Sequence, residues 1–330
     1  MCVGPRTYIE RLALHFVDLF GERPKERVSP LEKNDHPELD TSPLLGPDDV
    51  VKYQSLIGAL QWVITLGRFD IAVHVMSMSS FRAAPRVGHL DRLKRIVGYL
   101  VKMKFGYIRI RTDEPDYSML DEAKYDWAHT VYGEVKEEIP RDAPPTRGKR
   151  VVLTSYVDAN LYHDWVNGKS VTAVIHFVNQ TPVEWFSRKQ PTVETATYGS
   201  EFTAAKTAVQ QIMGLRTMLR YLGVQVHGCT RLFGDNGSVV TSGSIPHSPL
   251  KKRHHALAYH YTREAVASKA IDFRHIPGDL NPADILSKHW GYTQVWPLLR
   301  TCLFWQGDTA ELLLNPEAPD ASKGSDKVPS

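Results

Sequence analysis

Residues 150–189, RVVLTSYVDANLYHDWVNGKSVTAVIHFVNQTPVEWFSRK, contain three runs rich in β-branched and aromatic residues, separated by short polar turns. The runs are RVVLTSYVD (150–158), SVTAVIHFVN (170–179) and PVEWFSRK (182–189). This composition favours strands, and connections this short join neighbouring strands in antiparallel order. The stretch therefore predicts a three-stranded antiparallel meander.

A helical pattern follows in ETATYGSEFTAAKTA, residues 194–208, and continues to Leu222, where Gly223 ends it. Beyond it we predict a strand at TRLFGD (230–235), helices from Gly237 and over 253–268, a strand at AIDFRHIP (270–277), and a last helix that begins at NPADILSK (281–288). The resulting order, β-β-β-α-β-α-α-β-α, predicts an α/β fold with a mixed sheet.

The N-terminal part has a different texture. Residues 22–49 are polar and rich in Pro and Asp, which is typical of a loop, and helices are predicted over 51–67, 70–81 and 89–102. FGYIRIR (105–111) alternates like an edge or ribbon strand, and 113–149 has the charges and prolines of a linker.

The composition is that of a globular protein of 330 residues with 42% hydrophobic content, long enough for two domains. Cys2, Cys229 and Cys302 are too few and too scattered for a disulfide scaffold or a cysteine zinc site. No apolar run approaches the length of a membrane span, and the first residues lack the apolar core of a signal peptide. We therefore expect an intracellular protein, cytoplasmic or nuclear, without a membrane partner. The net charge of +3 is modest, but local basic runs permit a polyanionic partner.

Four acids occur at the ends of predicted elements: Asp158 ends the first strand of the meander, Glu201 opens the first helix after it, Asp235 ends the fourth strand and Asp284 opens the last helix. Taken alone, each helix acid is typical of a first-turn charge. In a sheet whose later strands run parallel to the first, however, all four can converge at one edge. Carboxylates this close repel one another unless cations are bound, and oxygen ligands indicate Mg²⁺ or Mn²⁺.

Several segments resemble the ribonuclease H domain of copia-type LTR retrotransposon polyproteins, in the C-terminal part of their reverse transcriptase. They are YVDANLYHD (156–164), SRKQPTVETATYGSEFTAAKTA (187–208), FGDNGSVV (233–240), KKRHHALAYHYTRE (251–264) and HIPGDLNPADILSK (275–288). Residues 53–100 resemble the connection region that follows the polymerase core in the same polyproteins. The resemblance implies a ribonuclease H-like mixed five-stranded sheet with flanking helices, preceded by a mainly helical connection region.

The resemblance also divides the chain. It implies a remnant of thumb and loop over 1–49, a helical connection region over 50–112, a linker over 113–149, a ribonuclease H-like domain over 150–290, and an extension with a disordered tail over 291–330. No second pair of catalytic carboxylates occurs upstream of the linker, so we expect a truncated reverse transcriptase fragment without the polymerase core.

The resemblance implies a site and a substrate. The four catalytic residues would be Asp158, Glu201, Asp235 and Asp284. They would bind two Mg²⁺ or Mn²⁺ ions, which would assist hydrolysis of the RNA strand of an RNA/DNA hybrid. The partners would be the hybrid and the remaining polyprotein parts, with no small-molecule cofactor. Residues expected to bind nucleic acid are Arg188, Lys189, Asn236, Lys251, Lys252 and Arg253.

Some positions depart from the family pattern. Gly237 stands where the family often has a Gln that contacts 2′-hydroxyls. The loop before the last predicted helix lacks a His, so His275 and His289 are auxiliary candidates. His254, His255 and His260 lack the i, i+4 pair that a metal site prefers, which favours packing and phosphate contact over zinc binding. The alternative to an active nuclease is a catalytically silent nucleic-acid-binding relic or a recruited interaction module.

Overall fold

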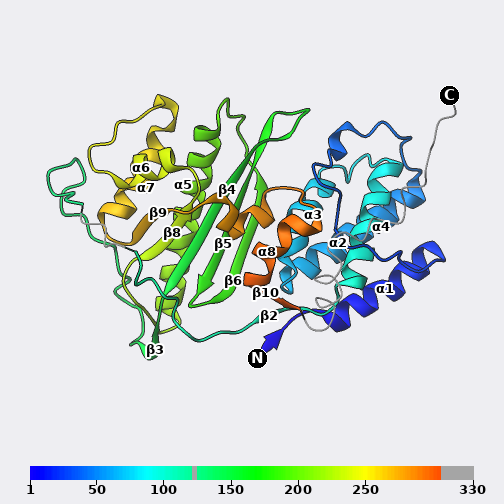
Figure 1. Ribbon diagram of the computed structural model, residues 1–330, viewed down its shortest axis with the longest axis horizontal. Helices are drawn as coiled ribbons and strands as arrows, with labels where there is room; N and C mark the ends of the chain where they lie inside the picture. Colours follow the sequence, from blue (N-terminus) through cyan, green and yellow to red (C-terminus); the bar gives the residue numbers. More distant parts are fainter. Residues whose placement is uncertain (121–124, 306–330) are drawn as a thin grey trace.

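The computed structural model describes residues 1–120 and 125–305. A mixed sheet with helices packed on it occupies one half of the molecule, and a cluster of N-terminal helices occupies the other (Figure 1). Residues 121–124 of the expected linker and residues 306–330 of the expected C-terminal extension and tail lie outside the described residues. Within the described ranges, no helix combines the length and apolar character needed to cross a membrane.

The main sheet has five strands in the order β6-β5-β4-β8-β9. The β4–β5 and β5–β6 pairs are antiparallel, whereas β8 pairs parallel with both β4 and β9. This order confirms the predicted meander and the ribonuclease H-like fold class. The strands are β4 (Leu153–Asp164), β5 (Lys169–Val178), β6 (Thr181–Lys189), β8 (Thr230–Gly234) and β9 (Ile271–His275).

Strand β5 is buried on both faces because its residues alternate between two hydrophobic cores. Val174 packs with Phe202 and Ile212 of the first long helix after the meander, whereas Ala173 and Ile175 pack in the core of the N-terminal helical cluster. Successive strand side chains point to opposite faces of a sheet. The double burial explains why SVTAVIHFV reads as a nearly unbroken apolar run.

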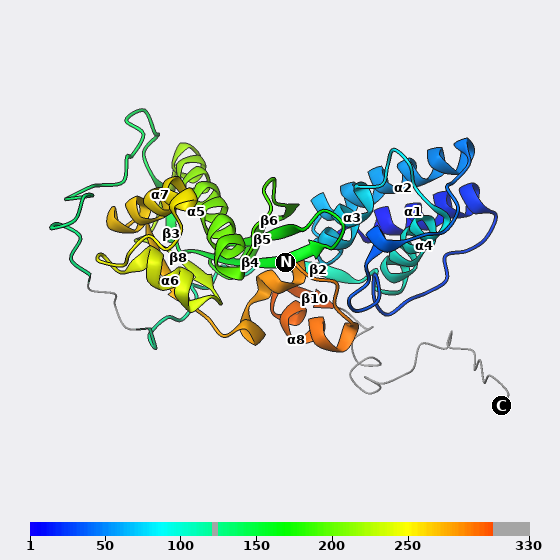
Figure 2. The same ribbon diagram turned by 90° about the horizontal axis from the view of Figure 1, so that it is seen from above.

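One face of the sheet carries the helices that follow the meander, α5, α6 and α7 (Figure 2). The predicted end of α5 is confirmed, since Gly223 adopts a φ of +72° that favours glycine. The helices are α5 (Thr197–Tyr221), α6 (Gly237–Ser244) and α7 (Ala256–Ala267), the last extending the 3₁₀ helix η3 (Arg253–His255).

The opposite face of the sheet packs against the N-terminal helices and the C-terminal segment (Figure 2). The three predicted N-terminal helices are confirmed, and a fourth, α1, precedes them with Ile9, Leu12 and Phe16 buried at helical spacing. The elements are α1 (Arg6–Phe20), η1 (Pro37–Leu39), α2 (Pro47–Thr65), η2 (Phe69–Ile71), α3 (Ala72–Ser79) and α4 (Val87–Lys102).

Two small sheets join distant parts of the chain. Strand β2 (Gly106–Arg109) is not an edge strand, because β1 (Cys2–Val3) and β10 (Leu303–Trp305) pair with its two sides. Strand β3 (Arg147–Val151), at the end of the expected linker, pairs parallel with β7 (Val224–Val226).

Two predicted boundaries are wrong. Asp158 does not end its strand, since β4 continues to Asp164 through its antiparallel pairing with β5. No α-helix begins at NPADILSK either: Gly278–Leu280 (η4) and Pro282–Leu286 (η5) are 3₁₀ helices, and α8 follows at Tyr292–Cys302. Asn281 starts η5 by accepting a hydrogen bond from the N–H of Ala283, and the chain leaves the helical path at Ser287.

Candidate active site

Three carboxylates converge at the edge of the sheet. Strands β4 and β8 run parallel and are paired up to Val157 and Gly234, so the next residues, Asp158 and Asp235, leave the paired region side by side. Asp284 approaches from η5, and carboxylate oxygens of all three lie within 4.8 Å of one another. The convergence that the sequence predicts for these three acids is therefore present.

Glu201 stands beside this triad rather than within it. Glu201 lies in the second turn of α5, one turn later than predicted, and only 7% of its surface is exposed. Burial, followed by repulsion from the carboxylates of Asp158 and Asp235, raises the pKa of Glu201 well above its usual value. Glu201 therefore belongs to the same electrostatic cluster as the three converging carboxylates.

Asp158 is the buried centre of the cluster. Its Oδ2 atom accepts a hydrogen bond from the Ser287 hydroxyl and lies 3.4 Å from Lys288 Nζ. Its Oδ1 atom is buried and has no hydrogen-bond partner among the described residues. An unsatisfied buried carboxylate oxygen is costly. An acceptor left free among other carboxylates fits a site that holds a divalent cation through oxygen ligands.

Lys288 supplies a positive charge inside the cluster. Its Nζ lies 2.7 Å from Asp284 Oδ1. Burial opposes the charged ammonium, but the carboxylates of Asp158 and Asp284 outweigh burial and raise the pKa of Lys288. Burial and the Asp158 carboxylate in turn raise the pKa of Asp284 to about 8, and the same two causes raise the pKa of Asp235.

Ser287 and Lys288 were not predicted from the sequence as site residues, although both belong to the NPADILSK segment. They follow Asp284 by three and four residues, the spacing at which one helical turn brings side chains together. That spacing is the signal that could have identified them.

His275 lies at the rim of the cluster. Its Nε2 is 3.0 Å from the backbone oxygen of Asp235, and the side chain is exposed. Gly237 is close to it: an added Cβ would meet His275 Cδ2 at 3.8 Å, an ordinary contact, and the backbone at Gly237 does not adopt positive φ. A side chain could therefore be placed at this position.

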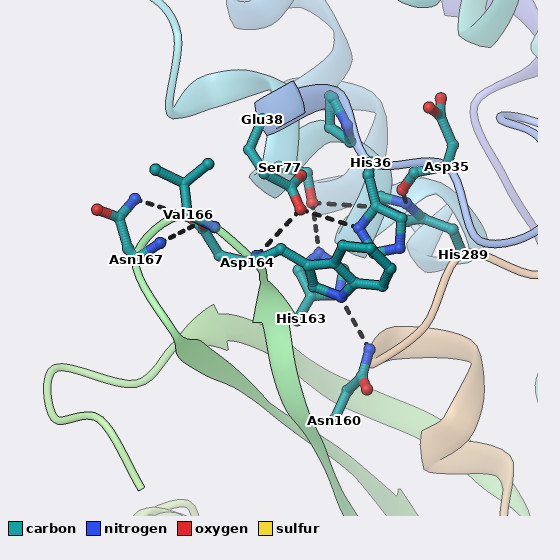
Figure 3. Close-up of polar contacts among 12 residues, drawn as sticks. Asp35, His36, Glu38, Ser77, Asn160, His163, Asp164, Val166, Asn167 and His289 are labelled. Atoms are coloured by element: carbon teal, nitrogen blue, oxygen red, sulfur yellow. Dashed lines mark hydrogen bonds and ion pairs between the residues drawn. The ribbon is translucent and has the colours of Figure 1, made fainter. Parts of the chain in front are cut away.

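His289 lies in a different environment, between the sheet and the N-terminal helices (Figure 3). Its Nε2 is 3.2 Å from Ser77 Oγ, its Nδ1 is 2.8 Å from the backbone oxygen of Asp35, and its ring stacks on His74. His163 Nε2 approaches the same hydroxyl at 2.9 Å. None of these described contacts of His289 is to the four acids, and burial lowers the pKa of His289.

The first group of residues expected to bind nucleic acid consists of Arg188 and Lys189 at the end of β6 and of Asn236 at the start of α6. At the end of β6, Arg188 is exposed, whereas Lys189 Nζ is 2.7 Å from Asp164 Oδ2. Asn236 caps α6, where its side chain accepts a hydrogen bond from Val239 N–H at 3.2 Å. Both Lys189 and Asn236 thus have structural partners in the protein.

The second group is the basic run before α7. Lys251 and Arg253 are exposed, and Lys252 is half-buried. Lys251 Nζ lies 5.1 Å from the ring centre of Tyr198 in α5. Nucleic-acid binding by these residues stays a prediction.

Comparison with known proteins found no matching family model. The chain is 23% identical over 242 residues to the Retrovirus-related Pol polyprotein from transposon RE2 of Arabidopsis thaliana, which covers 73% of this chain. It is 24% identical over 238 residues to the corresponding polyprotein from transposon TNT 1-94 of Nicotiana tabacum, which covers 72%. The chain is a homologue of copia-type transposon Pol polyproteins. It spans only 14% and 15% of the length of these two relatives.

A shorter relative is the Secreted RxLR effector protein 161 of Plasmopara viticola, 25% identical over 170 residues, which are 52% of this chain and 95% of the effector. Among solved structures, the N-terminal RNase H domain of Rv2228c from Mycobacterium tuberculosis, solved as a fusion with maltose-binding protein, is 12% identical with a TM-score of 0.33. It covers 46% of this chain and 98% of that chain. The ribonuclease H-like fold assignment rests on the strand order β6-β5-β4-β8-β9.

Proposed function

We propose that this chain is a ribonuclease H-type hydrolase that cleaves the RNA strand of RNA/DNA hybrids with the help of divalent metal ions. The observation that carries the proposal is the convergence of Asp158, Asp235 and Asp284, with Glu201 coupled to them, around a free buried oxygen of Asp158. The relationship to transposon Pol polyproteins supports the same activity. The sequence-based roles of the four acids, as catalytic residues and metal ligands, are part of this proposal.

The four carboxylates would hold two Mg²⁺ or Mn²⁺ ions. When bound, such ions activate a water nucleophile and stabilise the charge of the departing 3′ oxygen. Asp158 has one buried oxygen, Oδ1, free for a metal ion, while Ser287 donates a hydrogen bond to the other, Oδ2. Lys288 limits the repulsion between carboxylates before metal binds.

The remaining residues have supporting parts. Arg188, Lys251 and Arg253 are exposed and would contact backbone phosphates, which gives affinity without sequence discrimination. His275, at the rim beside Asp235, is better placed than the buried His289 to exchange a proton with water or product.

The test is incubation of the full chain with labelled RNA/DNA hybrid, duplex DNA and duplex RNA in Mg²⁺. We expect cleavage of the RNA in the hybrid and loss of cleavage in Asp158→Asn and Asp235→Asn, because each variant removes a charge from the metal site. Nucleotide incorporation into a primer is not expected. Cleavage by Asp235→Asn at the parental rate would refute the four-carboxylate site.

A second candidate, a recruited interaction module, has one observation in its favour. The relative named as a secreted effector is matched over 95% of its length by this chain, so a related segment exists as a protein in its own right. Hybrid binding without cleavage in Mg²⁺ or Mn²⁺ would favour this second candidate.

A further inference from the structure

A second cluster of ligand-type side chains lies outside the acid cluster. It consists of Glu194, in the loop between β6 and α5, and of His254 and His255 in η3. One ligand atom from each lies within 4.8 Å of the others. The three residues are brought together by the fold, since about 60 residues of chain separate Glu194 from the two histidines.

The distances suit one small cation. Glu194 Oε2 is 3.2 Å from His255 Nε2 and 3.7 Å from His254 Nε2. A tetrahedral zinc ion, with ligands at roughly 2.0 to 2.1 Å, separates neighbouring ligand atoms by about 3.3 Å. The side chains therefore need little movement to share an ion.

Gly199 leaves room at the point of convergence. A Cβ added there would lie 2.2 Å from Glu194 Oε2 and 3.1 Å from His255 Nε2. Gly199 is in the first turn of α5. Any side chain at this position would displace the Glu194 carboxylate, so the glycine permits the cluster to form.

The charge balance also points to a cation. The Glu194 side chain is 7% exposed, and its ion-pair partners within the described residues are His254 and His255. Burial lowers the pKa of His255, which favours the neutral, ligand-competent imidazole at neutral pH. A buried carboxylate beside neutral imidazole lacks a full compensating charge.

We propose that Glu194, His254 and His255 bind a Zn²⁺ ion that joins the loop before α5 to the start of α7. Two imidazole nitrogens and one carboxylate are a zinc ligand set, whereas the all-oxygen acid cluster suits Mg²⁺. His254, with its side chain 64% exposed, leaves the site open to solvent. This inference revises the sequence-based preference for packing, because the sequence offers no means of pairing Glu194 with these histidines.

The test is a zinc titration of the full chain in excess Mg²⁺, added to compete for the acid cluster, followed by isothermal calorimetry and by the visible absorption of Co²⁺ used as a probe. We expect one zinc equivalent that Mg²⁺ does not displace. His254→Ala should weaken it by about tenfold or more, and Glu194→Gln likewise. His254 is exposed, so its variant should fold normally.

The matched control is His247→Ala, which removes another exposed histidine outside the cluster. It should leave zinc affinity unchanged. The proposal is overturned if no Mg²⁺-resistant zinc equivalent binds, or if His254→Ala and Glu194→Gln both bind zinc as tightly as the parent. Neither outcome depends on hydrolysis of nucleic acid, so failure of the zinc site and failure of the proposed nuclease function are distinguishable.

Discussion

The carboxyl of Asp284 should make the metal-free protein progressively less stable as the pH rises from about 4 to about 8, and Asp284→Asn should remove that contribution. Folding raises the pKa of Asp284 from 3.8 to about 8, through burial and the neighbouring Asp158 carboxylate. A carboxyl of this kind holds its proton more tightly in the folded state. Its contribution to stability is therefore complete below pH 3.8 and is lost as the pH rises through about 8.

The size of the effect follows from that change. At about 1.4 kcal/mol per pKa unit, the rise from 3.8 to about 8 corresponds to roughly 6 kcal/mol of preference for the neutral form. Asparagine resembles the neutral carboxyl in shape and charge. The free energy of unfolding of Asp284→Asn should thus exceed that of the parent by an amount that grows with pH and reaches several kcal/mol above pH 8.

The assay is urea unfolding followed by circular dichroism, in EDTA, at several pH values between 5 and 9. The matched control is Asp279→Asn, the same change at an exposed residue of η4. Comparison of variants at each pH cancels groups that titrate in both. If the gap between Asp284→Asn and the parent is the same at pH 5 and pH 9, the reasoning is refuted. Added Mg²⁺ should stabilise the parent at pH 8 more than it stabilises Asp284→Asn.

Three further perturbations test other parts of the molecule. Lys288→Met should lower the melting temperature in EDTA and enlarge the rise caused by Mg²⁺, because it removes an ammonium that competes with metal; equal Mg²⁺ responses would contradict this. Gly237→Gln should fold normally and tighten hybrid binding by about 0.5 to 1.5 kcal/mol in a salt titration, through a hydrogen bond to the RNA strand; a folded variant with unchanged affinity and rate would remove this position from RNA recognition. Arg68→Met should cost about 3 to 5 kcal/mol in urea unfolding, because it leaves Asp70 buried without its charge partner; exposed Arg6→Met, the control, should change little.

The five strands of the main sheet, most of the helices and the convergence of Asp158, Asp235 and Asp284 at the sheet edge could be predicted from the sequence. The reason is local: β-branched runs, helical stripes and turn glycines act over a few residues and are legible in one chain. The family resemblance added that these strands form one mixed five-stranded sheet with flanking helices, and the structure supplied the order in which they pair. Helix α1 was also within reach, since Ile9, Leu12 and Phe16 have helical spacing.

Other features were decided by tertiary structure. Pairing with the antiparallel strand β5 extends β4 past Asp158. The end of the 3₁₀ helix η5 brings the next two residues, Ser287 and Lys288, into contact with Asp158. Strand β2 acquires both of its neighbours from the two ends of the described chain.

Tertiary structure also decides the contact of Glu194 with the histidines before α7. This contact requires α5 and α7 to pack together on the sheet that contains β6. Such contacts join residues far apart in sequence. Their geometry depends on how whole elements pack, and no local pattern of residue types encodes it.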